Sequence, residues 1–453
     1  MEEEAEQKPP EPGGGIDPKG LTLKRDPPKQ VKLSSFPDQP QYEKGGLPGT
    51  LENYEYLLYE HKIRCRTNVI TKRTEVIIPG HAGSVENAAN TAITEVHSLA
   101  ARHFLPSGPV QAMLDVFADR NPYNPVRTWI EGREWDGKDR LQAICDTLVT
   151  EAEFPLDFRD LLIRKWLLSA VAAALSVSGF RSRGVLTLQG PQGLGKTTWV
   201  RNLVPDTALS AEVVRLDHHL DASNKDSILI AIAHWIVEIG ELESSFKRDV
   251  ARLKGFLTLD RDKVRRPYAK EATEYPRRTV FCASVNSHDF LLDSTGNSRF
   301  WTLPLVAVEH DHGIDMQQVF AQLAIDFKNG AQWWLSQEEE QRLESLNKRH
   351  RAFSPVLDIL QGFIDFSPPE GAKSEALTAT EILTEAGVER PTSQQVKECA
   401  AVLREHLGPP RRIRGREKYR VVRRPQESPA ETASNDGPEE HVWPAPVKKP
   451  NFN

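Results

Sequence analysis

The sequence predicts an α/β fold of the P-loop NTPase class, with a mixed α+β domain before it and a winged-helix-like domain after it. Two observations predict the central fold. Residues 184–200 read GVLTLQGPQGLGKTTWV, a short apolar run that ends in a glycine-rich turn and continues into a helix-compatible stretch. Two later apolar runs, 235–239 and 279–285, carry or precede polar residues at their ends. Open α/β sheets place their chemistry at the carboxyl ends of such strands.

The composition is that of a soluble chain with disordered parts. Of its 453 residues 39% are hydrophobic, and the net charge of -6 means that nucleic-acid contacts must come from local basic patches. No apolar run reaches the ~20 residues of a membrane helix, and the acidic, proline-rich start matches no signal or transit peptide. Four cysteines lack metal or redox spacing, which favours a cytoplasmic chain with reduced, half-buried thiols: Cys65, Cys145, Cys282 and Cys399.

Changes in composition divide the chain into five segments. Residues 1–45 hold eight of the 32 prolines and are expected to be a disordered arm. Residues 46–150 carry helix and hairpin patterns of an α+β domain, and residues 151–350 carry the P-loop ATPase domain. Residues 355–424 show three helices and a basic β-ribbon, the pattern of a winged helix. Residues 425–453 return to the composition of a disordered tail.

The glycine-rich turn matches the phosphate-loop pattern G-x-x-x-x-G-K-[ST] between a strand and a helix. Its backbone N–H groups and the helix N-terminus would face the phosphates of ATP, and the lysine would reach the β- and γ-phosphates. The alternative is a strand-to-helix turn without a ligand. The candidate nucleotide-binding residues are Gly190, Pro191, Gln192, Gly193, Leu194, Gly195, Lys196, Thr197 and Thr198.

Two acids end the predicted strand that follows the loop. A phosphate-loop NTPase needs an acid to help hold Mg²⁺ and often a polar group to position the attacking water. Glu238 and Glu241 are the candidates, and Thr197 and Glu238 are the expected Mg²⁺ ligands. Alternatively, one of the two acids belongs to the first turn of the next helix, where the helix dipole favours a negative charge.

Two further polar residues, Asn286 and Arg299, lie next to predicted strands. Asn286 ends the third apolar run, beside the acid strand, where its amide could orient the γ-phosphate or the attacking water; the alternative is an Asx-turn. Arg299 precedes Phe300 and Trp301. It has the surroundings of an arginine finger that reaches a neighbouring subunit's nucleotide, and equally those of a structural arginine.

Two basic segments are candidates for nucleic-acid contact. The stretch 261–278 suggests a hairpin of two short strands, 264–268 and 273–275, with Lys270 at its tip. Its candidate contacts with a nucleic-acid backbone are Arg265, Arg266 and Lys270. The ribbon of the last domain carries Arg411, Arg412, Arg414, Arg416 and Lys418. For both segments the alternative is a solvated surface, on which charge also prevents unwanted strand pairing.

Several of these motifs together resemble the virulence-associated E family, which consists of replication-type ATPases of phages and prophages similar to superfamily 3 helicases. The resemblance extends over about 120–310. It rests on NPYNPVRTWIEGREWDGKDRL, GPQGLGKTT, WIVEIGELE, DRDKVRRPYAKEATEYPRRTVFCASVN and FLLDSTGNSRFWTLPL. It implies an AAA+/superfamily 3 helicase-like core that assembles into a hexameric ring.

The resemblance also implies roles for individual residues. Glu238 and Glu241 match the family's acidic strand, and Asn286 matches its sensor 1 residue. Arg299 matches the second arginine of an N-R-R-F-W-type segment, but Ser298 stands where that family usually has the first. The implied cofactors are ATP and Mg²⁺.

The function implied by the resemblance is that of an ATP-dependent DNA helicase or replication-initiation ATPase of phage or prophage type. ATP would be hydrolysed at subunit interfaces, and single-stranded DNA would lie in a central channel near the basic hairpin. Host or phage replication proteins are possible partners. The alternative is a nucleotide-gated DNA-binding module, for initiation or interference, without unwinding activity.

Overall fold

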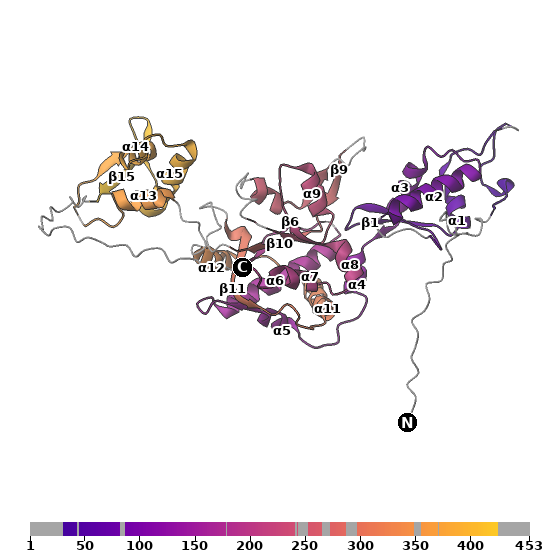
Figure 1. Ribbon diagram of the computed structural model, residues 1–453, viewed down its shortest axis with the longest axis horizontal. Coiled ribbons are helices and arrows are strands. Elements are labelled where there is room, and N and C mark those ends of the chain that lie inside the picture. The colour runs from indigo at the N-terminus through magenta and orange to yellow at the C-terminus, as the bar shows by residue number, and fades with distance from the viewer. Residues whose placement is uncertain are drawn as a thin grey trace, which may run out of the picture. The chain divides into compact units, whose positions relative to one another are not determined.

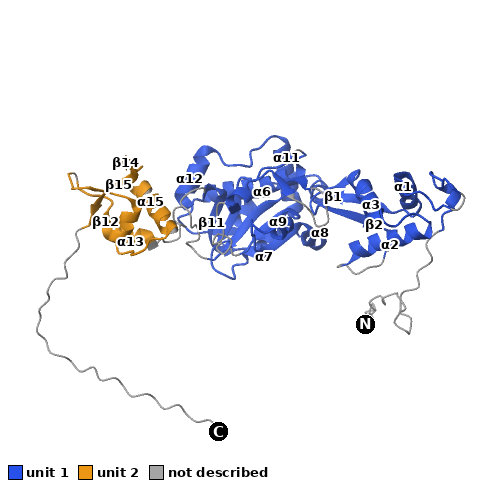
Figure 2. Ribbon diagram, turned by 90° about the horizontal axis from the view of Figure 1, so that it is seen from above, with its two compact units in different colours: residues 1–351 blue, residues 352–453 orange. Residues whose placement is uncertain are grey.

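The computed structural model describes residues 30–424, except 43–44, 82–86, 178, 241, 243–251, 265–271, 287–296, 348–354 and 370. The chain divides into two compact units, residues 1–351 and residues 352–453 (Figure 2). The first unit contains the central sheet and the N-terminal α+β elements, and the second contains three helices and a ribbon.

A sheet that includes β6, β10 and β11 forms the centre of the first unit (Figure 1). It has six strands, in the order β4-β11-β5-β10-β7-β6. Its strands are β4 (Leu148–Thr150), β5 (Val185–Gln189), β6 (Val214–His218), β7 (Ile236–Ile239), β10 (Val280–Val285) and β11 (Phe300–Val308). All neighbours are parallel except β4, which is antiparallel to β11. The three strands predicted from apolar runs are therefore present as β5, β7 and β10, and β10 lies between the other two.

Helix α6 (Leu156–Leu175) packs against this sheet with most of its side chains buried. Tryptophan N–H groups tie the layers together. Trp166 Nε1 donates to Phe281 O of β10 at 2.8 Å, and Trp235 Nε1 donates to Ala170 O of α6 at 2.8 Å. Other helices of the unit are α7 (Lys196–Asn202), α8 (Thr207–Val213), α9 (Lys225–Ile232), α11 (Met316–Lys328) and α12 (Gln337–Asn347).

The domain around the sheet begins earlier than the predicted boundary at residue 150. Helices α4 (Pro125–Ile130) and α5 (Leu141–Asp146) bury Val126 and Ile144 in the same core as the sheet. Because β4 is itself an edge strand of this sheet, the boundary lies near residue 124.

The N-terminal α+β elements have a separate hydrophobic core. Their strands are β1 (Arg64–Asn68), β2 (Arg73–Ile77) and β3 (Pro122–Tyr123), and their helices are η1 (Leu33–Ser35), α1 (Leu51–Glu60), α2 (Ala88–Arg102) and α3 (Val110–Asp119). The predicted hairpin is the β1–β2 pair. The predicted disordered arm over residues 1–45 is wrong in part, because Val31 and Phe36 are buried in this core.

Two further predictions concern the second half of the unit. The predicted hairpin near 264–275 is the antiparallel pair β8 (Arg261–Val264) and β9 (Thr273–Pro276). The stretch 316–346 is mostly helical. It is two helices, α11 and α12, because Asn329 and Gly330 end the first, as residues favoured after a helix C-terminus do.

The second unit contains α13 (Pro355–Phe363), α14 (Ala379–Glu385), α15 (Ser393–Leu407), β12 (Ile364–Asp365), β13 (Glu375–Leu377), β14 (Arg411–Ile413) and β15 (Arg416–Arg423). Strands β14 and β15 form the predicted ribbon. Thr378 and Thr392 make capping boxes with Glu381 and Gln395. In each capping box the threonine hydroxyl accepts from a backbone N–H of the helix's first turn.

Candidate nucleotide-binding site

The glycine-rich turn connects β5 to α7 at the carboxyl edge of the sheet. Gly193 and Gly195 both have a φ of +86°, in the left-handed region that side chains with a Cβ avoid. Gly195 has a second constraint, because a Cβ there would overlap the His310 ring, whose Cγ would lie 3.1 Å away. Helix α7 then begins at Lys196, so the N-terminus of that helix faces the turn.

The ammonium group of Lys196 lies inside the turn. Its Nζ donates to Gly190 O at 2.6 Å, to Pro191 O at 2.9 Å and to Asn286 Oδ1 at 3.1 Å. Burial lowers the pKa of Lys196, and the negative charge of Glu238 opposes that shift. The structure thus brings Asn286, at the end of β10, next to the predicted phosphate-binding lysine.

The Glu238 carboxylate is buried on β7, the neighbour of β10, and accepts hydrogen bonds from hydroxyl and amide groups. Thr197 Oγ1 donates to Glu238 Oε1 at 2.7 Å, and Ser284 Oγ donates to the same oxygen. The Asp217 N–H donates to Glu238 Oε2 at 3.3 Å. The two predicted Mg²⁺ ligands, Thr197 and Glu238, are therefore in direct contact.

Sequence reasoning missed two residues that contact Glu238. Ser284 is a polar residue inside an apolar run, two positions before Asn286 and so on the same face of its strand; that spacing is a signal that could have identified it. Asp217 lies on β6, a strand for which the sequence offers no apolar run.

Arg299 lies apart from these residues. It ends the short helix η2 (Asn297–Arg299) and precedes β11, in which Phe300 pairs with Val185 and Pro304 with Gln189. Arg299 is thus at the amino edge of the sheet, level with Gly184 and six residues from Gly190, which is about 20 Å along the strands at about 3.3 Å per residue. Any contact between Arg299 and a nucleotide would have to involve another chain's nucleotide.

Four other predicted site residues lie outside the described part of the chain: Glu241, Arg265, Arg266 and Lys270. The described base of the β8–β9 hairpin leads through Arg277 into β10. It is thus joined to the amino end of the strand whose carboxyl end carries Asn286.

A family model for the virulence-associated protein E-like domain matches residues 130–352. Residues 130–352 belong to this family. The virulence-associated protein E-like domain includes the central sheet, the glycine-rich turn, Glu238, Asn286 and Arg299, and its match begins near the boundary that packing indicates. The resemblance to the virulence-associated E family is therefore confirmed.

Comparison with solved structures yields distant likenesses. Apo structures of the NrS-1 C-terminal region align with TM-scores of 0.40, 0.37 and 0.38 and sequence identities of 13%, 13% and 14%. Each alignment covers 82% of this chain and 98% of the other. At such scores the likeness carries no argument about function. No curated protein matches the chain significantly.

The basic ribbon lies beyond the virulence-associated protein E-like domain, in the second unit. Arg414, with a φ of +50°, and Gly415, with a φ of +80°, form its two-residue turn. Four of the predicted DNA-binding side chains are exposed: Arg411, Arg412, Arg414 and Arg416. The fifth, Lys418, is half-buried, and its Nζ contacts Glu381 Oε2 at 3.3 Å. The arginines are therefore better placed than Lys418 to contact a ligand.

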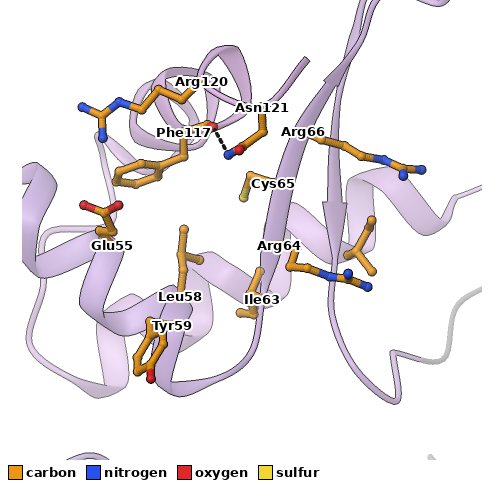
Figure 3. Close-up of a pocket in the computed structure, with 11 residues that line it drawn as sticks. Glu55, Leu58, Tyr59, Ile63, Arg64, Cys65, Arg66, Phe117, Arg120 and Asn121 are labelled. Atoms are coloured by element: carbon orange, nitrogen blue, oxygen red, sulfur yellow. Dashed lines mark hydrogen bonds between the residues drawn. The ribbon is translucent and has the colours of Figure 1, made fainter. Parts of the chain in front are cut away.

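A pocket of about 430 Å³ lies before the virulence-associated protein E-like domain, among the N-terminal elements (Figure 3). Leu58 and Ile63 line it together with the exposed Arg64 and Arg120. Arg66, also at the pocket, forms an ion pair with Glu75 at 2.6 Å and stacks on Tyr123. No residue of the glycine-rich turn lines this pocket, so it is a separate feature.

The other chemistry of the described residues is limited. The four cysteines are free and buried, and burial raises the pKa of Cys65 to about 11 and of Cys399 to about 12. The described residues contain no group of three or more His, Cys, Asp or Glu side chains that could hold a metal. Within the same residues, no helix has the length and apolar character needed to cross a membrane.

Proposed function

We propose that this chain hydrolyses ATP and uses the energy to act on DNA during phage or prophage replication. The observation that supports ATP hydrolysis is the meeting of Lys196, Thr197, Glu238 and Asn286 around the left-handed glycine turn. Membership in the virulence-associated protein E-like family supports a role in replication.

The residues present fit ATP and Mg²⁺. The turn offers backbone N–H groups and a lysine, which suit phosphate oxygens, and Thr197 and Glu238 offer the oxygen ligands that Mg²⁺ prefers. Mg²⁺ typically takes one or two protein ligands and completes its shell with phosphates and water, so the lack of a larger acidic group among the described residues is compatible with it. Bound Mg²⁺ would neutralise charge on the phosphates.

Each side chain of the site then has a defined task. Lys196 exchanges the carbonyl oxygens of the turn for phosphate oxygens, and it keeps Asn286 within reach. The Asn286 amide orients the γ-phosphate or the attacking water. Glu238, whose carboxylate already accepts the Thr197 hydroxyl, keeps its negative charge on the metal side of the site.

Arg299 completes the site from a neighbouring subunit in this proposal. Its place at the amino edge keeps it away from the glycine turn of its own chain. A ring, which we propose to be a homohexamer, would present this edge to the next subunit's nucleotide. A guanidinium there would stabilise the charge that develops during phosphoryl transfer.

DNA contact is proposed for the tip of the β8–β9 hairpin and for the exposed ribbon arginines. The activity would be that of a DNA helicase or a replication-initiation ATPase. The second candidate is a nucleotide-gated DNA-binding module without unwinding. The exposed ribbon favours it, because four arginines outside the ATPase domain could bind DNA without hydrolysis.

The test is ATP hydrolysis by the full chain, with and without single-stranded DNA, together with its mass in solution. DNA-stimulated turnover by a ring-sized assembly supports the proposal and justifies a strand-displacement assay. A monomer that binds DNA and ATP but hydrolyses no ATP supports the second candidate. A chain that binds neither ligand contradicts both.

Glu238→Gln is expected to retain ATP binding and to lose about 100-fold in turnover. Glutamine preserves the size of the side chain and can still accept the Thr197 hydroxyl, but it removes the buried charge. Binding of a fluorescent ATP analogue and steady-state hydrolysis measure the two effects separately. Glu344→Gln, an exposed change on α12, is the control. Equal losses of binding and turnover would contradict the assigned role.

The double variant Arg411→Glu/Arg412→Glu is expected to weaken DNA binding at least about 10-fold, because two potential phosphate contacts become repulsive. ATP turnover without DNA should be unaffected. Fluorescence anisotropy at several salt concentrations measures the change, and the slope against salt should become shallower. Arg390→Glu, an exposed charge reversal in the same unit, is the control. Unchanged affinity would assign DNA contact to other residues.

A further inference from the structure

The strand β6 is distorted next to the candidate site. Its pairing with β7 is regular at Arg215, which lies opposite Val237, and shifts before His218. Within this irregularity Asp217 has a φ of +50°, in the left-handed region. A non-glycine residue adopts this conformation at a cost, and such strain is typically found at functional sites. Some interaction therefore has to hold Asp217 in place.

The distortion directs the Asp217 N–H toward Glu238. That N–H donates to Glu238 Oε2 at 3.3 Å, while the other oxygen accepts the hydroxyls of Thr197 and Ser284. The three donors come from β6, α7 and β10, which are separate elements. A carboxylate held at both oxygens from three directions cannot rotate freely. The β6 contact is the only described one on Oε2.

Gly240, two residues after Glu238, leaves the space that Asp217 occupies. A Cβ at Gly240 would overlap Asp217 Oδ1 and would lie 3.0 Å from Asp217 Cγ and 3.1 Å from its Cα. No side chain larger than hydrogen therefore fits there while Asp217 keeps its position. Asp217 of β6 therefore packs directly against Gly240, just after β7, and the contact requires glycine at position 240.

We propose that Asp217 is a positioning residue for Glu238 and that Gly240 is its required counterpart. Its backbone amide fixes Glu238 Oε2, and so keeps Oε1 on the Thr197 side, where Mg²⁺ would bind. Aspartate and asparagine tolerate left-handed backbone better than other side chains, which explains the residue type. This inference rests on the proposed ATP hydrolysis and adds a residue that orients its acid.

The first test is a series at Asp217 in the full chain. Asp217→Asn and Asp217→Gly tolerate the left-handed backbone and should retain turnover within about 3-fold of the native chain. Asp217→Ala disfavours it and should lower kcat about 10-fold and raise the Mg²⁺ concentration for half-maximal activity. Nucleotide binding without Mg²⁺ should stay the same in all three. An Asp217→Ala variant with native kcat and Mg²⁺ requirement would overturn the proposal.

Two comparisons separate positioning from other effects. Lys62→Ala, at an exposed residue with a φ of +57° among the N-terminal elements, introduces the same kind of backbone strain and should leave the Mg²⁺ requirement unchanged. Loss of activity in Asp217→Asn as large as in Asp217→Ala would instead make the carboxylate itself essential, and would overturn a role through the backbone amide.

The second test is a double-variant cycle. Gly240→Ala should lower kcat about 10-fold, because the new methyl group displaces Asp217. Asp217→Gly/Gly240→Ala should recover part of this loss, since the contacts with Oδ1 and Cγ disappear while the 3.1 Å contact with Cα remains. No recovery would overturn the complementary pairing. Melting temperatures of all variants identify any general loss of folding.

Mg²⁺-dependent binding of a fluorescent ATP analogue keeps this inference separate from the proposed function. If the native chain binds nucleotide with Mg²⁺ but does not hydrolyse it, the proposed hydrolysis fails. The positioning role is then tested by the gain in nucleotide affinity that Mg²⁺ produces. Asp217→Ala should reduce this gain, whereas Asp217→Asn and Asp217→Gly should not. Absence of any Mg²⁺-dependent binding in the native chain overturns both.

Discussion

Replacing Lys196 with alanine is expected to lower the rate of ATP hydrolysis by about 10²–10³-fold, the usual cost of removing one group that stabilises charge in the transition state. The ammonium group lies within 3.1 Å of two carbonyl oxygens of the glycine turn and of Asn286. It is therefore placed where phosphate oxygens would compete for it. Alanine leaves those oxygens without a cation and removes the contact that ties the turn to β10.

The measurement is steady-state ATP hydrolysis with and without single-stranded DNA. Lys328→Ala removes a side chain that is 62% exposed, on α11, and is the matched control. The melting temperature of each variant shows whether the turn still folds. DNA-stimulated hydrolysis at the native rate in Lys196→Ala would contradict the assignment of the site.

Asp262→Ala is expected to lower the free energy of unfolding by about 3–5 kcal/mol, the range for breaking a buried ion pair by removing one partner. The Arg277 side chain is fully buried, and its Nε donates to Asp262 Oδ2 at 3.0 Å. Its remaining side-chain contacts among the described residues are Phe256 O at 2.8 Å and the rings of Phe256 and Phe281. Without Asp262 this guanidinium would be a buried charge with no counter-charge in the described part of the chain.

Urea unfolding of the full chain measures this change. The double variant Asp262→Leu/Arg277→Met removes both charges and should be less destabilised than Asp262→Ala, because apolar replacement of a whole pair is often nearly neutral. If Asp262→Ala unfolds at the native urea concentration, the pair does not anchor the hairpin.

Much of the arrangement of the candidate site was predictable, because the pattern that points to it is local. The apolar run of β5, the glycine turn and Lys196 are contiguous in the sequence. Glu238 and Asn286 each mark the end of an apolar strand, and parallel strands bring such ends to one edge. The sequence analysis placed the strand of Asn286 beside the strand of Glu238, and the pairing of β10 with β7 confirms this.

The missed features depend on contacts between distant segments. Strand β6 has exposed and buried positions and no apolar run, so neither the strand nor Asp217 could be recognised from pattern alone. The burial of Val31 and Phe36 within a proline-rich segment depends on a core built mainly by later residues. Arg299 lies at the amino edge of the sheet because of the register in which β11 pairs with β5. The sequence does not specify that register.

Strand β10 has one end at each edge of the sheet. At its start, Thr279 Oγ1 donates to His234 O at 2.7 Å, directly after the Arg277 anchor of the hairpin; at its end, Asn286 meets Lys196. Thr279 and Asn286 are seven residues apart along the strand, which at about 3.3 Å per residue separates these ends by about 23 Å. Thermodynamic linkage then sets a condition on a motor that binds ATP at one end of β10 and DNA at the hairpin joined to the other end. The factor by which ATP alters affinity for DNA at the hairpin must equal the factor by which DNA alters affinity for ATP.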